Sequence, residues 1–96
     1  MKVLFHKKFQ KFIQRTKDKE LLERIKLEVD SIIKQPNQGK LLEHPFRKYK
    51  IQSIGFLYKK NSYRIAYTIN HKDKEIVFLL IYSRENFYQK LTHILN

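Results

Sequence analysis

Arginine and tyrosine lie close together at two points in the second half of the chain, where they could contact a phosphate. The first point is the segment from Asn61 to Ile69, in which apolar and polar residues alternate as in a β-strand. This alternation places Arg64 on a strand face that otherwise carries only Ala66 and Thr68. Because these neighbours are small, a large anion could approach the guanidinium, although an acid across the sheet could also pair with it.

The second point follows the most apolar stretch of the chain. Ile76 to Ile81 is apolar at every position, which is typical of a central strand covered on both faces. A polar cluster comes directly after it and contains Arg84, Glu85 and Tyr88. Arginine and tyrosine at strand ends are suited to hold a phosphate backbone.

The net charge indicates what kind of partner the chain has. Its 96 residues include 21 lysines and arginines but only nine acids, which gives a net charge of +12. This excess favours a polyanionic partner such as RNA, DNA, a ribosome, an anionic membrane or a strongly acidic protein. A generally lysine-rich proteome is the alternative explanation.

Several classes of protein are excluded or disfavoured by composition. No run approaches the roughly 18 apolar residues that a membrane span needs, so we expect no span, and a membrane is not among the expected partners. The absence of cysteine excludes disulfides and fits a reducing compartment, so we expect a cytoplasmic location. His6, His71 and His93 are too far apart for a ligand pattern, and there is no glycine-rich phosphate loop. We therefore expect neither a metal nor a cofactor.

The hydrophobic pattern predicts one α+β domain over residues 1–96, with a strand, two helices, three strands and a final helix in that order. We expect an N-terminal strand, a helical hairpin and a C-terminal helix with a small antiparallel sheet, the helices packed on one face of the sheet and the other face partly open. Thr16 or Asp18 is the expected N-cap of the second helix, and Gly55 indicates a bulge or a close backbone approach. The predicted ranges are 1–5 for the first strand, a helical hairpin up to 33, a polar connector at 39–47, strands at 48–58, 63–69 and 75–82 with a turn at 59–62, and a helix at 85–95.

In size, element order and basicity, the chain resembles the RelE/ParE superfamily of toxins from toxin–antitoxin systems. The segment Tyr63-Arg64-Ile65-Ala66-Tyr67 is similar to the family's Tyr-Arg-(apolar)-x-Tyr strand. The apolar strand and the polar turn after it resemble the family's central strand and the start of its last helix. The resemblance covers almost the whole chain and implies the RelE-like fold.

For the RelE branch, the resemblance implies a metal-independent endoribonuclease that cuts mRNA on the ribosome and inhibits translation. In this chemistry a base activates a ribose 2′-OH, basic side chains stabilise the phosphate, and an acid protonates the leaving oxygen. Arg64 matches the arginine that contacts the scissile phosphate, and Tyr88 matches the tyrosine that stacks on or polarises the nucleotide. Arg84 lies in the basic patch before that tyrosine, at a different spacing from the best-known members.

The chain departs from the family pattern in the strand before Arg64. The family's Lys-x-Lys pair aligns with Gly55 and Leu57. The candidates to replace the pair as RNA or phosphate ligands are Lys48, Lys50, Lys59 and Lys60. The possible acid and base residues are Glu43, His44 and Glu85.

The resemblance also implies partners and leaves alternatives open. The expected partners are mRNA, the ribosome and a cognate antitoxin whose acidic segment folds over the basic sheet face, with an antitoxin helix on the helical surface. Operator DNA would be reached only indirectly, through the antitoxin. The first alternative is a ParE-like inhibitor of DNA gyrase without RNase activity. The second is a non-catalytic member that acts only in antitoxin and operator binding.

Overall fold

A five-stranded sheet forms the centre of the protein in the computed structural model, which describes residues 1–95. The strands lie in the order β1-β5-β4-β3-β2, and two short 3-10 turns interrupt the connector before β3. The elements are β1 (Lys2–Phe5), α1 (Lys7–Arg15), α2 (Lys19–Lys34), η1 (Pro36–Gln38), β2 (Lys40–Leu41), η2 (Arg47–Tyr49), β3 (Gln52–Tyr58), β4 (Asn61–Asn70), β5 (Glu75–Ser83) and α3 (Arg84–Leu95). The predicted α+β class is confirmed, and so is the element order apart from β2, a two-residue strand within the segment predicted as a connector. No helix within these residues has the length and hydrophobicity needed to cross a membrane.

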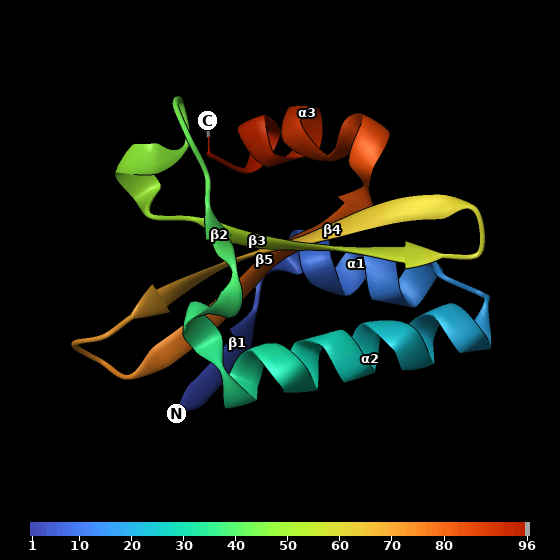
Figure 1. Cartoon of the computed structure of the whole chain (residues 1–96), viewed down its shortest axis with the longest axis horizontal. Coiled ribbons are helices and arrows are strands. Elements are labelled where there is room, and N and C mark those ends of the chain that lie inside the picture. Colours follow the sequence, from blue (N-terminus) through green and yellow to red (C-terminus); the bar gives the residue numbers. More distant parts are fainter. Residues whose placement is uncertain (96) are drawn as a thin grey trace.

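The helices cover both faces of the sheet. Figure 1 shows α1 and α2 on one side and α3 on the other. Each side has its own core, one around Ile32, Tyr67 and Phe78 beneath the hairpin, and one around Phe87 and Leu91 of α3. The prediction that the helices share one face, with the other partly open, is therefore wrong. The apolar run in β5 explains why helices pack on both faces: its side chains point to both sides of the sheet, and both sets must be buried.

A bulge in β5 helps that strand to serve both cores. Ala66 pairs with Leu80 and Tyr67 pairs with Phe78, so Leu79 is an extra residue opposite β4. Leu79 and Leu80 both pack in the core on the α3 side, whereas Phe78 packs in the core under α1 and α2. Gly55 of β3, where the sequence predicts a bulge or a close backbone approach, pairs in regular register with Arg64, so the bulge lies here, between β4 and β5.

The sheet is mixed rather than purely antiparallel. β1 runs parallel to β5, while the pairs β2–β3, β3–β4 and β4–β5 are antiparallel. A parallel pair needs a long crossover connection, and here all of the chain from α1 to β4 lies between the two strands.

The second helix begins at a well-made N-cap. The carboxylate of Asp18 accepts hydrogen bonds from the backbone N–H groups of Glu20 and Leu21, at 3.0 and 3.2 Å. It also accepts one from the Tyr58 hydroxyl, which ties the helix to the end of β3. Thr16 instead ends α1, where its hydroxyl donates to the carbonyl of Phe12 at 2.6 Å. Asp18 is therefore the cap, as one of the two predicted candidates.

The connector between α2 and β3 is packed rather than simply polar. Leu42 and Phe46 are buried in the core under α3, and β2 adds two residues to the edge of β3. The buried Tyr67 hydroxyl accepts from the Gly39 N–H at 2.9 Å and donates to the Pro36 carbonyl at 2.7 Å. The Tyr67 contacts hold the start of the connector on the hairpin side of the sheet, whereas Leu42 and Phe46 hold its later part on the face that carries Arg64.

Candidate functional site

Arg64 points from β4 across the neighbouring strand. It pairs in register with Gly55 of β3, and its Nη2 donates to the Ser53 hydroxyl at 2.9 Å. A Cβ at position 55 would lie 2.9 Å from Arg64 Nη1, closer than such atoms normally approach. The missing side chain of Gly55 therefore makes room for the guanidinium, which confirms the predicted close approach.

The charge of Arg64 is not neutralised by the protein. Its Nε is buried and has no hydrogen-bond partner among the residues described. Within residues 1–95, no carboxylate lies at ion-pair distance from its guanidinium, so the cross-sheet pair that could have explained this arginine is not present. The hydroxyl of Ser53 is neutral and does not compensate the charge of the half-buried guanidinium, so an anion bound beside Arg64 would be stabilised.

One cleft beside Arg64 collects three further residues that the sequence pointed to. Its volume is about 460 Å³, and it is bounded by the connector, β4 and α3. The lining residues are Lys40, Leu41, Leu42, Glu43, His44, Phe46, Arg64 and Tyr88. A guanidinium, a phenol, an imidazole and a carboxylate thus meet around one space.

Tyr88 is held at the edge of this cleft by other aromatic rings. Its ring lies 6.0 Å from that of Phe46 and 5.1 Å, edge-on, from that of Phe87. Even so, 44% of the residue remains exposed. Packing on one side and exposure on the other suit a ring against which a nucleotide base can stack.

The possible acid and base residues differ in their surroundings. Glu43 faces Arg47 across 3.7 Å, but both side chains are largely exposed, so this ion pair holds the carboxylate only weakly. His44 lines the Arg64 cleft next to it and is exposed. Glu85 lies elsewhere, in a depression that also contains Lys60 and Arg84.

Arg84 connects that depression with Arg64. It stands at the first position of α3, and with Arg64 it lines a second hollow along the edge of β3. Arg24 of α2 lines the same hollow, where its Nη1 donates to the Leu57 carbonyl at 3.0 Å. Three guanidinium groups therefore surround the open edge of β3.

The remaining predicted lysines do not line the Arg64 cleft. Lys48 and Lys50 were expected on a strand, but Lys48 lies in η2 and Lys50 follows it in the left-handed conformation, with φ of 55°. Lys59 lies at the β3–β4 turn, 3.7 Å from the carboxylate of Asp18, and the Tyr58 hydroxyl and that carboxylate raise the pKa of Lys59. Lys60 contributes to the depression beside Arg84. The prediction of alternating strand lysines is wrong because the strand starts only at Gln52.

Two polar residues of the site, Ser53 beneath Arg64 and Lys40 in the cleft lining, were not identified from the sequence. Ser53, which is buried, holds Arg64, and Lys40 adds a further cation on β2. Ser53 could have been found from the hairpin register, because a two-residue turn sets Ser53 and Gly55 on the face of Arg64. Lys40 carried no comparable signal.

The fold is similar to that of two solved toxin structures. The isolated RelE toxin of E. coli superposes with a TM-score of 0.66, covering 99% of this chain and 98% of RelE at 14% sequence identity. A chain of the intact E. coli RelBE toxin–antitoxin complex superposes with a TM-score of 0.63, covering 83% of this chain and 92% of the other at 13% identity. At such identities, these similarities show the fold alone.

The sequence itself identifies the family. Residues 3–92 match the ParE-like toxins of type II bacterial toxin–antitoxin systems, and the chain belongs to this family. The predicted membership of the RelE/ParE superfamily is confirmed. Among curated proteins, no sequence matches the chain.

Proposed function

We propose that this type II toxin is a metal-independent endoribonuclease that cuts mRNA on the ribosome. The observation that carries the proposal is the uncompensated guanidinium of Arg64, which shares a cleft with Tyr88 and His44. A phosphodiester could accept hydrogen bonds from this guanidinium while its base stacks on Tyr88.

The proposed reaction uses the ribose 2′-OH as nucleophile. A base takes the proton from the 2′-OH, the oxygen attacks the adjacent phosphorus, and the bond to the 5′ oxygen breaks as an acid protonates that oxygen. Arg64 and Arg84 stabilise the negative charge that builds on the phosphate. Glu43 and His44 are the better candidates for the proton transfers, because both line the cleft of Arg64, whereas Glu85 lies in the neighbouring depression.

The proposed protein partner is a cognate antitoxin. The RelE-like neighbour in the RelBE complex is bound in a toxin–antitoxin assembly, and the net charge of +12 suits an acidic partner segment. The antitoxin would cover the basic face and, with a helix, part of the α1–α2 surface. Contact with operator DNA would pass through the antitoxin.

The first test compares Arg64→Ala with the wild type and with Lys72→Ala, which removes an exposed cation from the β4–β5 turn. Each chain is induced without antitoxin, and growth and the 5′ ends of cellular mRNA are recorded. We expect Arg64→Ala to lower cleavage by about 10²-fold or more, as for loss of a donor to a developing oxyanion. Lys72→Ala should cleave as the wild type does. Normal growth and unchanged transcripts with the wild-type chain would refute the proposal.

Gyrase inhibition is the second candidate function. It is favoured by the match to ParE-like toxins and by Gly55 and Leu57, which stand where the RelE pattern has lysines. The same fold would then carry an interaction surface instead of a catalytic site. An Arg64→Ala chain that stays toxic, together with wild-type inhibition of supercoiling by purified gyrase, would favour this candidate.

A further inference from the structure

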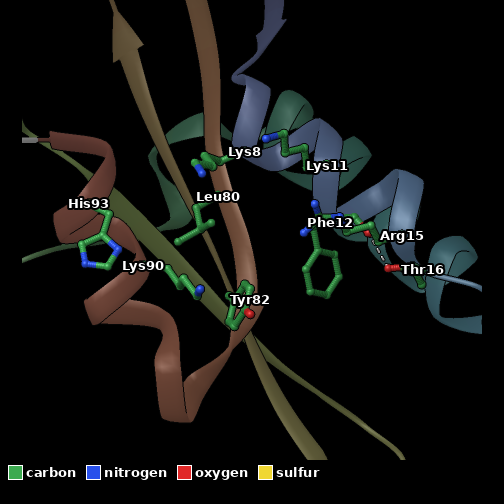
Figure 2. A pocket seen from close by; sticks show the side chains of 9 residues that line it. All are labelled: Lys8, Lys11, Phe12, Arg15, Thr16, Leu80, Tyr82, Lys90 and His93. Carbon is green, nitrogen blue, oxygen red and sulfur yellow. Dashed lines mark hydrogen bonds between the residues drawn. The ribbon is translucent and has the colours of Figure 1, made fainter.

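A second basic cleft lies on the other side of α3. Its volume is about 400 Å³, and it opens between α1 and α3 over β5, as Figure 2 shows. β1 pairs only with Glu75 to Phe78 of β5, so the rest of that strand edge has no neighbouring strand. α1 packs along β5 and forms one wall of the cleft, and α3 forms the other.

Both walls carry positive charge. Lys8, Lys11 and Arg15 are spaced on one side of α1, while Lys90 comes from α3, which also places the His93 ring in the lining. No aspartate or glutamate of the described residues is among those that line the cleft. Neighbouring like charges repel one another, so the arrangement stabilises the protein most when an anion lies between them.

The floor of the cleft is aromatic and apolar. Tyr82 and Leu80 form the floor, with Phe12 beside them on α1. The Tyr82 ring lies 5.7 Å from that of Phe12, and the ammonium of Lys90 is 5.3 Å from the Tyr82 ring centroid. An acidic peptide would contact only the cationic walls and leave the aromatic floor unused. A nucleotide can contact both, because its phosphate binds the cations and its flat base stacks on the aromatic floor.

The cleft adjoins the Arg64 site across the sheet. Tyr82 and Arg64 are register partners on β5 and β4, and both lie on the face that α3 covers. Tyr88 lines the Arg64 cleft on one flank of α3, and Lys90 lines the second cleft on the other flank. A nucleic-acid chain bound in the Arg64 cleft could therefore pass around the start of α3 and reach the second cleft.

We propose that the α1–α3 cleft binds one nucleotide of single-stranded RNA, outside the bond that is cut. The phosphate contacts Lys8, Lys11 and Arg15, and the base or sugar lies against Tyr82. This inference rests on the proposed function in one respect, namely that the ligand of the toxin is RNA. Cleavage itself is not required for the cleft to bind.

The test measures binding without reaction. A fluorescent hexanucleotide with 2′-O-methyl groups cannot supply the attacking hydroxyl, so its anisotropy reports affinity alone. Lys8→Gln/Lys11→Gln is compared with Lys34→Gln/Lys72→Gln, which removes two exposed cations outside the cleft. We expect the first pair to weaken binding about tenfold and to reduce the salt dependence of log K by about 1.4, the value for two contacts with single-stranded phosphates. The control pair should change affinity less than about twofold.

Each other outcome decides against the inference. If both double variants weaken RNA binding equally, the overall positive charge of the protein determines the affinity, and the α1–α3 cleft is not a specific RNA site. Displacement of the RNA probe by hexaglutamate but not by cytidine monophosphate would assign the cleft to an acidic peptide. Tyr82→Leu keeps the floor of the cleft apolar but removes the aromatic ring. Unchanged affinity of this variant for the RNA probe would show that no nucleotide lies against Tyr82 in the cleft. Cleavage of unmodified RNA is measured separately, so a wild-type chain that binds but never cuts contradicts only the proposed function.

Discussion

Position 55 decides where the Arg64 guanidinium lies. A side chain there would occupy the space above β3 that Arg64 crosses on its way to Ser53. The family's first strand lysine would fall at this position, so the lysine and the present course of Arg64 exclude each other sterically. With glycine at position 55, the strand carries no cation there, but the Arg64 guanidinium can reach over it.

Gly55→Ala tests this dependence. The added Cβ meets the end of a flexible side chain, so Arg64 should move while the strand remains intact. Alanine should even favour folding by about 0.5–1 kcal/mol over glycine in a strand. We expect RNA cleavage to fall on the order of 10- to 100-fold, as for a misplaced catalytic group, without a lower melting temperature.

The control for Gly55→Ala is Ser53→Ala, which removes the hydroxyl partner of Arg64 but adds no atom in its path. It should reduce cleavage less. If Gly55→Ala cleaves as well as the wild type, the guanidinium position seen over β3 has no bearing on the reaction.

At the level of elements, the β3–β4 hairpin shows what the sequence can reveal. The alternation of apolar and polar residues was sufficient to place Arg64 on the face with Ala66. In a half-buried strand, alternate side chains are buried and exposed, so the sequence itself shows which residues share a face. The turn was predicted two residues too long. It consists of Lys59 and Lys60, with Lys59 left-handed at φ of 56°, and neither residue is one that usually signals a tight turn.

The connector before β3 could not be predicted in the same way. Leu42 and Phe46 are isolated apolar residues in a polar stretch, and they are buried because α3 covers them from a distant part of the sequence. This packing brings Glu43 and His44 to Arg64. The 3-10 turn at Arg47–Tyr49, with Lys50 as its cap, then keeps Lys48 and Lys50 out of the strand. The cleft is thus a product of tertiary contacts that local patterns do not contain.

The N-cap of α2 should make stability depend on pH. The hydrogen bond from Tyr58 lowers the pKa of Asp18, with help from the cap N–H groups and Lys59, although burial opposes the shift. A carboxyl with a lower pKa in the folded state adds stability above its unfolded pKa, and this stability is lost as pH falls through the folded value. Asp18→Asn keeps a capping oxygen but removes the charge.

We therefore expect Asp18→Asn to melt at a lower temperature than the wild type at neutral pH, and the difference to shrink below about pH 4. Thermal unfolding of both chains from neutral to acidic pH measures this. Tyr58→Phe serves as the companion variant, because it removes the hydrogen bond that contributes most to the lowered pKa of Asp18. In the Tyr58→Phe background, Asp18→Asn should lower the melting temperature at neutral pH by less than it does in the wild type. A difference that stays constant down to low pH would show that the charge of Asp18 is not involved.

Across the whole molecule, the sheet separates two kinds of surface. The Arg64 cleft lies on the face under α3, and the α1–α3 cleft opens at the edge of β5, whereas the α1–α2 side has an apolar groove of about 710 Å³. That groove is lined by Val3, Phe5, Phe9, Gln10, Ile13, Gln14, Leu22, Ile25, Lys26, Val29, Asp30 and Ile33. An antitoxin with an amphipathic helix and an acidic segment could bind both surfaces, and its helix would not need to touch the RNA site.

Neutralisation and toxicity should therefore be separable by mutation. Leu22 lines the apolar groove and is half-buried, so Leu22→Lys places a charge where an antitoxin helix would bury apolar surface. Leu27→Lys is the matched control, because Leu27 lies on the same helix but is 65% exposed and outside the groove. We expect Leu22→Lys to bind the antitoxin at least about tenfold more weakly, the equivalent of roughly 1.4 kcal/mol, while RNA cleavage by the free toxin stays unchanged. The antitoxin is titrated against both variants by calorimetry, and growth is recorded on co-expression. If Leu22→Lys is neutralised as fully as Leu27→Lys, the antitoxin helix does not use this groove, and the basic face must supply most of the binding free energy.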